Sequence, residues 1–323
     1  MANRRNSYES KQDMVFNRKA KRRIKTSIMN KITTLAVLIC SITIMTTLIL
    51  NFLTRGSVEP NKAKLEGKYG HMEIAKSSEI PEHLKNAIIS IEDKRFYSHK
   101  GVDIIGIGRA MVRNLVKDSS EGGSTIEMQI SKNLLTSQEK TYRRKLQDIK
   151  IASQMNKCMT KDDILEVYLN SIYLAEGATG VKAGARIYFG KDVSELNLAE
   201  AAMLAGITKH PSKYVPYIKK EIKINDKKEQ LENKLVFTTL EENSDSKTDI
   251  EIVEKLNNMG LLSEERYEQL KDGKIIVSRA ELNPQSVSRQ KLVLEIMKSN
   301  HRISKKEFED ANNTQIVLNT SLK

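Results

Sequence analysis

One long apolar block lies near the N-terminus of the chain. Residues 32–54, ITTLAVLICSITIMTTLILNFLT, contain no charged side chain, and a membrane-spanning helix needs about 20 mostly apolar residues. The block is longer than the roughly 7–15-residue apolar core of a cleaved signal peptide, and no small-residue cleavage site follows it. The pattern predicts an uncleaved membrane anchor over residues 32–54. A cleaved signal or a buried core helix are the alternatives.

A helical period begins after residue 81. Four apolar residues recur at the i, i+3, i+4, i+7 spacing of one helix face, namely Leu84, Ala87, Ile88 and Ile91, which predicts a helix with one buried face that ends near Glu92. Similar spacing predicts further helices over residues 103–116, 124–135, 138–155, 161–174, 179–188 and 197–207.

Short polar side chains precede three of these segments and are predicted to cap them. Asp103 precedes the first, Thr160 with Asp163 caps the segment at 161–174, and Ser124 with Glu127 has the S-x-x-E form of a capping box. The sequence HMEIA, residues 71–75, is the one short strand that the pattern suggests. The predicted fold class is therefore mainly α.

The composition changes after residue 217. Residues 218–250 are rich in Lys, Glu, Asp and Asn, which is typical of a solvated helix or a charged linker. Beyond them, residues 254–273 and 295–314 align without gaps as a weak internal repeat. Each copy contains a helix, a short turn and a serine, Ser263 or Ser304, placed to cap a second helix. Residues 251–323 are therefore predicted to form two helical hairpins, with packing or a partner surface as their role.

The net charge of +13 is unevenly placed. The first 32 residues hold ten Lys or Arg against two acidic residues, so this basic tail accounts for +8. The positive-inside tendency places residues 1–31 in the cytoplasm and residues 55–323 outside. Nucleic-acid binding is disfavoured because the basic tail directly precedes the apolar block. Cys40 lies within that block, so Cys158 has no cysteine partner for a disulfide in the outer part.

Reactive side chains gather in three short stretches. Residues 90–103, SIEDKRFYSHKGVD, hold Glu92, Asp93, His99 and Asp103. Alone, such an acidic pair is typical of a solvated helix end, and a single histidine is typical of a packed, hydrogen-bonded residue. Residues 122–133, GGSTIEMQISKN, place two glycines before a helix start, where free amide groups bind anions. Residues 143–148, RRKLQD, add basic side chains beside Asp148. Together they indicate a site for a phosphate-bearing substrate next to a carboxylate base.

The same stretches resemble the ordered motifs of the peptidoglycan glycosyltransferase family, the transglycosylase domain found in monofunctional transglycosylases and class A penicillin-binding proteins. EDKRFYSHKGVD is similar to its first motif, GGSTIEMQISKNLL to its second, and RRKLQD to its third. The stretch ILEVYLNSIYLAEGATGVKAGARIYFG and the residues after it, up to 217, resemble the remaining motifs. The resemblance covers about residues 65–217, and SRQKLVLEIMKSNHRISKKEFEDA resembles the segment that usually closes the domain.

This resemblance implies a lysozyme-like helical transglycosylase domain over residues 55–217, behind a single anchor in a bacterial cell membrane. Such enzymes polymerise lipid II into glycan strands, with inversion at the anomeric carbon and release of undecaprenyl pyrophosphate. Glu92 matches the general base, and Asp148 matches a second acid that assists at the pyrophosphate, directly or through a divalent cation such as magnesium or manganese. The matching basic residues, which stabilise the pyrophosphate, are Lys132, Lys140, Arg144 and Lys145. Ser124, Thr125 and Gln129 match sugar and phosphate contacts.

Several positions depart from the family pattern. Asp148 replaces a glutamate, Met128 replaces the first of two glutamines, and Lys140 stands where arginine is common, which removes bidentate geometry. YLAEGATG also differs from the usual loop. Two hypotheses therefore stay open beside each other: an active enzyme, and a weakened family member that binds lipid II as a scaffold. A lysozyme-like hydrolase is the third, which the basic cluster disfavours because a neutral glycan does not require one.

The elements of a transpeptidase are missing from the sequence. Residues 137–140 have the Ser-x-x-Lys spacing, but they lie inside the transglycosylase resemblance, and no K-T-G follows. The predicted partners are lipid II, the growing glycan strand, the membrane and a separate transpeptidase.

Overall fold

The computed structural model of the chain describes residues 29–30, 32–48, 60–69, 73–117, 122–136, 141–240 and 247–320. The chain divides into two units, residues 1–57 and residues 58–323. In the first unit, residues 32–48 are helical, and the remainder of the predicted anchor, residues 49–54, lies outside the described residues. None of the described helices combines the length and apolarity that a membrane span requires. The anchor over residues 32–54 therefore stays a prediction.

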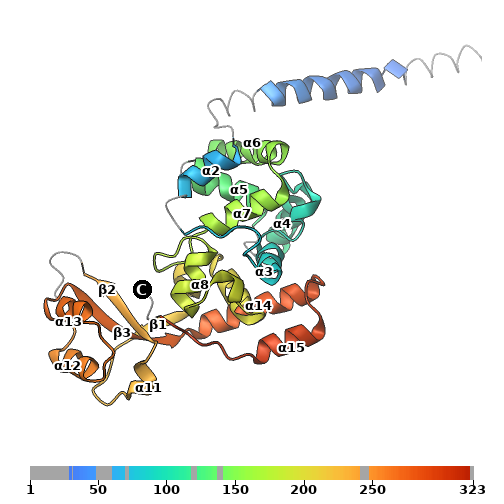
Figure 1. The fold of residues 1–323 in the computed structure, drawn as a ribbon. Helices are drawn as coiled ribbons and strands as arrows, with labels where there is room; N and C mark the ends of the chain where they lie inside the picture. Colours follow the sequence, from blue (N-terminus) through green and yellow to red (C-terminus); the bar gives the residue numbers. More distant parts are fainter. Residues whose placement is uncertain are drawn as a thin grey trace, which may run out of the picture. The chain divides into compact units, whose positions relative to one another are not determined.

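The second unit is mainly helical in its described part (Figure 1). Its helices are α2 (Lys62–Tyr69), α3 (Glu82–Glu92), α4 (Ile104–Lys117), α5 (Ile126–Ile130), α6 (Tyr142–Cys158), α7 (Lys161–Ser171), α8 (Val181–Phe189), α9 (Leu198–Ile207), α10 (Pro211–Tyr214), α11 (Lys228–Leu231), α12 (Ile250–Asn258), α13 (Glu264–Lys271), α14 (Pro284–Ser299) and α15 (Lys305–Asn313). Short helical turns are η1 (Phe96–Ser98), η2 (Ser131–Leu135) and η3 (Val193–Glu195), of which η2 is π-helical.

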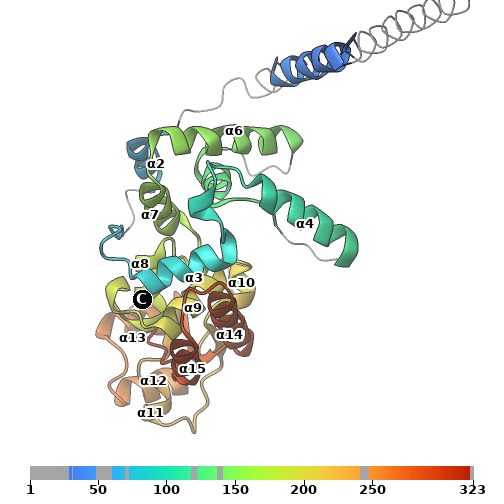
Figure 2. The same cartoon turned by 90° about the vertical axis from the view of Figure 1, so that its right-hand side faces the viewer.

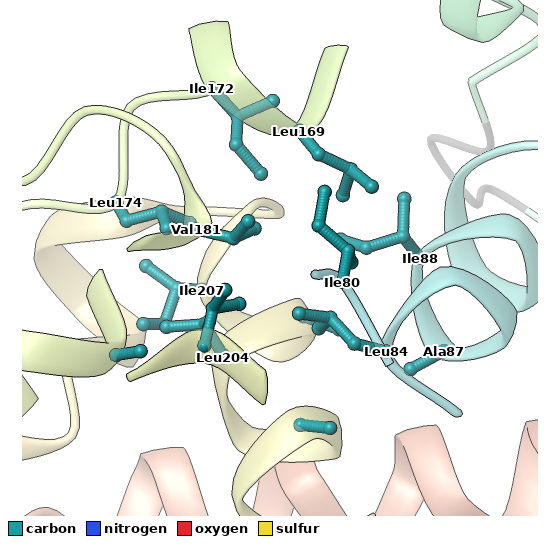
Figure 3. Close-up of a cluster of buried hydrophobic side chains, with 14 of the residues drawn as sticks. Ile80, Leu84, Ala87, Ile88, Leu169, Ile172, Leu174, Val181, Leu204 and Ile207 are labelled. Carbon is teal, nitrogen blue, oxygen red and sulfur yellow. The ribbon is translucent and has the colours of Figure 1, made fainter. Parts of the chain in front are cut away.

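The core is organised around α9. Every residue from Ala199 to Ile207 is buried, so this helix has no polar face, as expected of a helix surrounded by others. Helices α3 and α14 pack against it. Figure 3 shows side chains of α3, α7, α8 and α9 converging in one cluster, with Leu84 and Ile88 on one side and Leu204 and Ile207 on the other. Burial of this cluster fixes the C-terminal ends of α3 and α9.

The predicted helices of residues 81–217 are present, with different ends. The segment predicted at 124–135 is divided into α5 and η2, and the helix predicted at 161–174 ends at Ser171 because Ile172 is extended. Asp103 accepts the backbone N–H of Gly106, and Thr160 forms a capping box with Asp163, as predicted.

Two local predictions are wrong. Thr125, not Ser124, caps α5, because its hydroxyl accepts the backbone N–H of Met128 while Ser124 bonds elsewhere. The strand predicted at 71–75 is not formed over its described residues 73–75. Residues 71–72 lie outside the described part of the chain.

The charged segment at 218–250 is not a linker. Strand β1 (Tyr217–Lys220), strand β2 (Leu235–Thr239) and strand β3 (Ile275–Leu282) form an antiparallel sheet in the order β1-β3-β2. The third strand lies within residues 251–323, which we predicted to contain helices alone. Leu231, Val253, Leu256 and Leu270 form a second hydrophobic core against this sheet. Strands β1 and β2 were missed because they span only four and five residues. The pairing of both strands with β3 joins residues that are distant in sequence, which no local pattern reveals.

The internal repeat is present in the structure. Helices α12 and α13 form one pair and α14 and α15 the other, and α15 lies beside α14 in both views (Figure 2). Ser263 and Ser304 cap the second helix of each pair, as predicted. The aligned turn residues Gly260 and His301 both have positive φ, at 68° and 56°. Each follows a helix end at which the next residue bonds back five positions, which is the Schellman geometry that favours glycine.

This alignment predicts that substitutions at the two turn positions have opposite effects on the free energy of unfolding. Substitution of exposed His301 by glycine is expected to raise the free energy of unfolding by about 1 kcal/mol, since it removes the steric cost of a left-handed residue. Substitution of Gly260 by alanine is expected to lower it by a similar amount. A new Cβ at Gly260 meets no atom within 4 Å, so the cost is conformational. Urea denaturation of the full chain followed by circular dichroism measures both. Changes of the same sign in the two variants would contradict the prediction.

Candidate active site

A cavity of about 670 Å³ collects the predicted site residues. Its walls come from the C-terminal end of α3, from α4, α5 and α6, and from residues at the end of α9 and along α14. Eight of the residues predicted from the sequence line it: Glu92, Ser124, Thr125, Gln129, Lys132, Arg144, Lys145 and Asp148. Lys140 lies outside the described residues.

Glu92 is the last residue of α3 and is half-buried in the cavity wall. Each of its carboxylate oxygens accepts one hydrogen bond. Gln129 of α5 donates its side-chain amide to Oε2 at 2.8 Å, and the hydroxyl of Thr208, just after α9, lies 2.5 Å from Oε1. Both donors are neutral, so Glu92 has no ion-pair partner among the hydrogen bonds and salt bridges of the described residues. A carboxylate has about four lone-pair positions, so further positions stay available for a substrate hydroxyl.

A buried tyrosine fixes the orientation of the Gln129 amide. Tyr168 of α7 donates its hydroxyl to Gln129 Oε1 at 3.3 Å. Burial raises the pKa of Tyr168 well above its usual value, and the negative charge of Glu92 adds to this shift. Tyr168 therefore stays a neutral donor, which turns the amide nitrogen of Gln129 toward Glu92.

A cationic wall, made of Lys132, Arg144 and Lys145, lies in the same cavity. Lys132 is exposed, whereas Arg144 and Lys145 of α6 are half-buried. The Lys145 ammonium donates to the Ser124 hydroxyl at 2.8 Å. Burial lowers the pKa of Lys145, and Arg144 and Lys132 lower it further, while Asp148 raises it. Cations gathered in one cavity are suited to a multiply charged anion.

Asp148 is almost fully buried, with 1% of its surface exposed. Its Oδ1 accepts the hydroxyls of Ser131 at 2.8 Å and Thr136 at 3.0 Å, and its Oδ2 accepts the Arg144 guanidinium. These bonds link η2 to α6 and hold the Arg144 side chain in the cavity wall. A divalent cation at Asp148 would compete with the guanidinium for the same carboxylate, so the residues present do not fit a metal there.

Thr125 is also engaged by the protein itself. It is 1% exposed, its hydroxyl donates to the carbonyl of Gly101 at 2.7 Å, and it accepts the backbone N–H of Met128. Both bonds shape the turn before α5. Ser124 is more open to the cavity because its hydroxyl bonds only to Lys145 among the hydrogen bonds of the described residues.

Asp93, the residue after Glu92, forms a buried pair with His99. Oδ2 of buried Asp93 accepts hydrogen bonds from His99 Nε2 at 2.9 Å and from the backbone N–H of Ile126 at 3.2 Å. This joins the end of α3 to the start of α5. The ligand atoms of Asp93, His99 and Glu127 lie within 4.8 Å of one another, but the Lys161 ammonium already bonds Glu127 at 2.6 Å. The cluster therefore already contains a cation, the Lys161 ammonium, in the place where a metal ion would bind Glu127.

The sequence analysis did not identify every charged or polar residue of the cavity. The lining also includes Arg109, Thr208, Lys209 and Arg289. Thr208 lies in the segment that resembles the family, but no spacing distinguishes its hydroxyl from any other. Only the packing of α9 against α3 brings it to Glu92, which is 116 positions away in sequence.

The chain matches one family model and several known proteins. The sequence model of the transglycosylase family, described as Transglycosylase, matches residues 61–237, more than half of the chain. Penicillin-binding protein 1A of Neisseria lactamica is 48% identical over 161 residues, covering 49% of this chain and 20% of that protein. A putative transglycosylase of Cupriavidus necator is 51% identical over 133 residues, covering 41% of this chain and 58% of that protein.

A solved structure, penicillin-binding protein 1A from Haemophilus influenzae, matches 76% of this chain and 18% of its own, at 20% sequence identity and a TM-score of 0.32. The chain thus spans about a fifth of the penicillin-binding protein from N. lactamica and little more than half of the C. necator protein.

The buried Asp148 network predicts a large effect on stability. Substitution of Asp148 by alanine removes the buried carboxylate that accepts from Arg144, Ser131 and Thr136, so the free energy of unfolding is expected to fall by about 3–5 kcal/mol. The matched control is Glu309→Ala, since Glu309 forms an exposed pair with Lys305 at the same i, i+4 spacing. That change is expected to cost less than about 0.5 kcal/mol. Urea denaturation measures both, and equal small losses would contradict a structural role for Asp148.

Proposed function

The chain belongs to the transglycosylase family, and we propose that it is a peptidoglycan glycosyltransferase that polymerises lipid II into glycan strands. One observation carries the proposal. A half-buried carboxylate without an ion-pair partner among the described residues, Glu92, shares a cavity of about 670 Å³ with the cations Lys132, Arg144 and Lys145. A base beside an anion-binding wall is what transfer of a sugar from a lipid pyrophosphate requires.

Glu92 acts as the general base. Its carboxylate takes the proton from the 4-hydroxyl of the acceptor sugar while that oxygen forms a bond to the anomeric carbon of the growing strand. The bond from this carbon to the pyrophosphate oxygen breaks, and the electron pair leaves with undecaprenyl pyrophosphate. Attack from the face opposite the leaving group inverts the anomeric carbon. The proton ends on Glu92 and passes to solvent when the products leave.

The cationic wall stabilises the leaving group. Negative charge grows on the pyrophosphate as its bond to carbon breaks, and fixed cations in a cavity stabilise such charge more than water does. Arg144 can meet two phosphate oxygens at once, and its direction is set by Asp148. We assign Asp148 this positioning role in place of acid catalysis, because its oxygens are already bonded. Ser124 and Gln129 are polar side chains of the cavity that can contact sugar and phosphate.

A lipid-linked substrate also requires a membrane surface. Ile104, Ile105 and Val112 of α4 are exposed by 79%, 62% and 61%, an apolar group on the helix that borders the cavity. Together with the predicted anchor at residues 32–54 and the basic tail, these residues support a chain held at the membrane with its N-terminus in the cytoplasm and its catalytic unit outside. A separate transpeptidase would then cross-link the product.

Removal of the base tests the proposed activity. Glu92→Gln is expected to lower polymerisation of labelled lipid II by about 10²–10⁴-fold, since an amide cannot take the proton. Glu82→Gln at the exposed start of the same helix is the matched control and is expected to leave the rate unchanged. Gel analysis of glycan strands gives the readout. Binding of lipid II without polymer by the unaltered chain would instead support the scaffold hypothesis.

The depressed pKa of Lys145 predicts a pH dependence. An ammonium is charged only below its pKa. The affinity for inorganic pyrophosphate should therefore begin to fall at a lower pH than it would if Lys145 had the ordinary lysine pKa of 10.5. Lys145→Arg keeps its charge throughout this range, and the fall is expected to move to higher pH. Titration calorimetry between about pH 7 and 10 measures this. The control is Lys305→Arg on the surface, which is expected to leave the pH dependence unchanged. If affinity fell over the same pH range in Lys145→Arg as in the unaltered chain, Lys145 would not be the group responsible.

A further inference from the structure

The hydroxyl of Thr208 lies between two acceptors. Its Oγ1 is 2.5 Å from Glu92 Oε1 and 2.9 Å from the backbone carbonyl of Ala205. A hydroxyl carries one proton and two lone pairs. Thr208 can therefore donate to only one of these oxygens at a time, and what it does toward Glu92 depends on whether Glu92 carries a proton.

Both protonation states of Glu92 can be satisfied by the same atoms. When Glu92 is ionised, Thr208 donates to Oε1, and a separation near 2.5 Å is typical of a hydroxyl bonded to a carboxylate. The Ala205 carbonyl still accepts the backbone N–H of Thr208 at 3.3 Å. When Glu92 is protonated on Oε1, its O–H can donate to Thr208 Oγ1, and the Thr208 proton turns to Ala205. Only two hydroxyl groups have to rotate.

Gln129, in contrast, can donate a hydrogen bond to Glu92 but cannot accept one from it. Its amide nitrogen is a donor only, and its amide oxygen already accepts the Tyr168 hydroxyl. It therefore favours an unprotonated Oε2 in every state. With Gln129 on Oε2 and Thr208 on Oε1, the arrangement accommodates a proton on Oε1 alone.

We propose that Thr208 is a positioning residue for Glu92 that serves both protonation states, donating to the ionised base and accepting from the protonated one. This inference rests on the proposed function, in which Glu92 gains a proton in every turnover. The carboxyl group is then held in one orientation before and after the transfer. The packing of Leu84 and Ile88 of α3 with Leu204 and Ile207 of α9 (Figure 3) holds the two helix ends at the required separation.

Charged groups from the neighbouring elements border the same cavity. The cations are Lys94 just after α3, Arg109 of α4, Lys132 of η2, Arg144 and Lys145 of α6, Lys209 just after α9, and Arg289 of α14. The anions are Asp93, Asp103 and Asp148, which all accept hydrogen bonds from the protein. These groups are unchanged in variants of Thr208 or Gln129, so differences in titration between such variants report on the exchanged side chain.

The first test compares Thr208→Val with Thr208→Ser. Valine has nearly the same shape without the hydroxyl, and polymerisation of labelled lipid II is expected to lose about tenfold in kcat from poorer orientation of the base, with KM within about twofold. Serine keeps the hydroxyl and is expected to stay within about threefold of the unaltered chain. A valine variant with unchanged kcat, or a serine variant as slow as the valine variant, overturns the proposal.

The second test separates a two-way hydroxyl from a simple donor. Carbon-13 NMR of glutamate-labelled chain, with Glu92→Gln used to assign the signal, follows the protonation midpoint of residue 92. Gln129→Leu removes a donor that supports only the ionised form, so the midpoint is expected to rise by about one pH unit or more. In Thr208→Val both forms lose a bond, and a rise of less than half that size is expected. An equal rise in the two variants overturns the proposal.

The two tests distinguish this inference from the proposed function. If the unaltered chain makes no polymer, the proposed function fails, and the NMR comparison still decides the role of Thr208. If the unaltered chain polymerises lipid II and Glu92→Gln does not, the function stands, and the Thr208 variants decide the inference alone.

Discussion

Two hydrogen bonds on the oxygens of Glu92 are the interaction on which the site depends. One donor comes from α5 and the other from the end of α9, so the carboxylate joins parts of the chain that are distant in sequence. Neither donor is charged, and thus the carboxylate is oriented without an ion pair among the described residues. The rest of the cavity supplies charge at other positions. This separation between an oriented carboxylate and a cationic wall supports the proposed glycosyl transfer from a pyrophosphate.

The buried core explains why those bonds can form. Helix α9 is enclosed by α3, α14 and their neighbours, and a close-packed interior permits little displacement of its ends. Buried polar networks add direction to this packing. Asp93 joins α3 to α5, and Asp148 joins η2 to α6 and bonds Arg144, so a buried carboxylate supports the position of Glu92 and another supports that of Arg144. Buried charged groups of this kind specify geometry, since their bonds are satisfied in only one arrangement.

The C-terminal third adds structure that the chemistry of the cavity does not explain. The three-stranded sheet and α11 to α13 form their own small core, while α14 belongs to the main core and contributes Arg289 to the cavity wall. The repeat that relates α12–α13 to α14–α15 therefore serves two different environments. One copy packs on the sheet, and the other supports the site.

The sequence by itself determined the helical class, the positions of most helices before residue 217, the family and eight of the residues that line the cavity. These follow from local periodicity, from capping side chains and from motifs whose residues are close in sequence. Tertiary structure alone showed that Asp148 and Thr125 are buried and bonded to other parts of the protein. It also decided the sheet, since its strands pair across tens of residues, and the contact between Thr208 and Glu92. No local pattern encodes these features, because each depends on how distant segments pack.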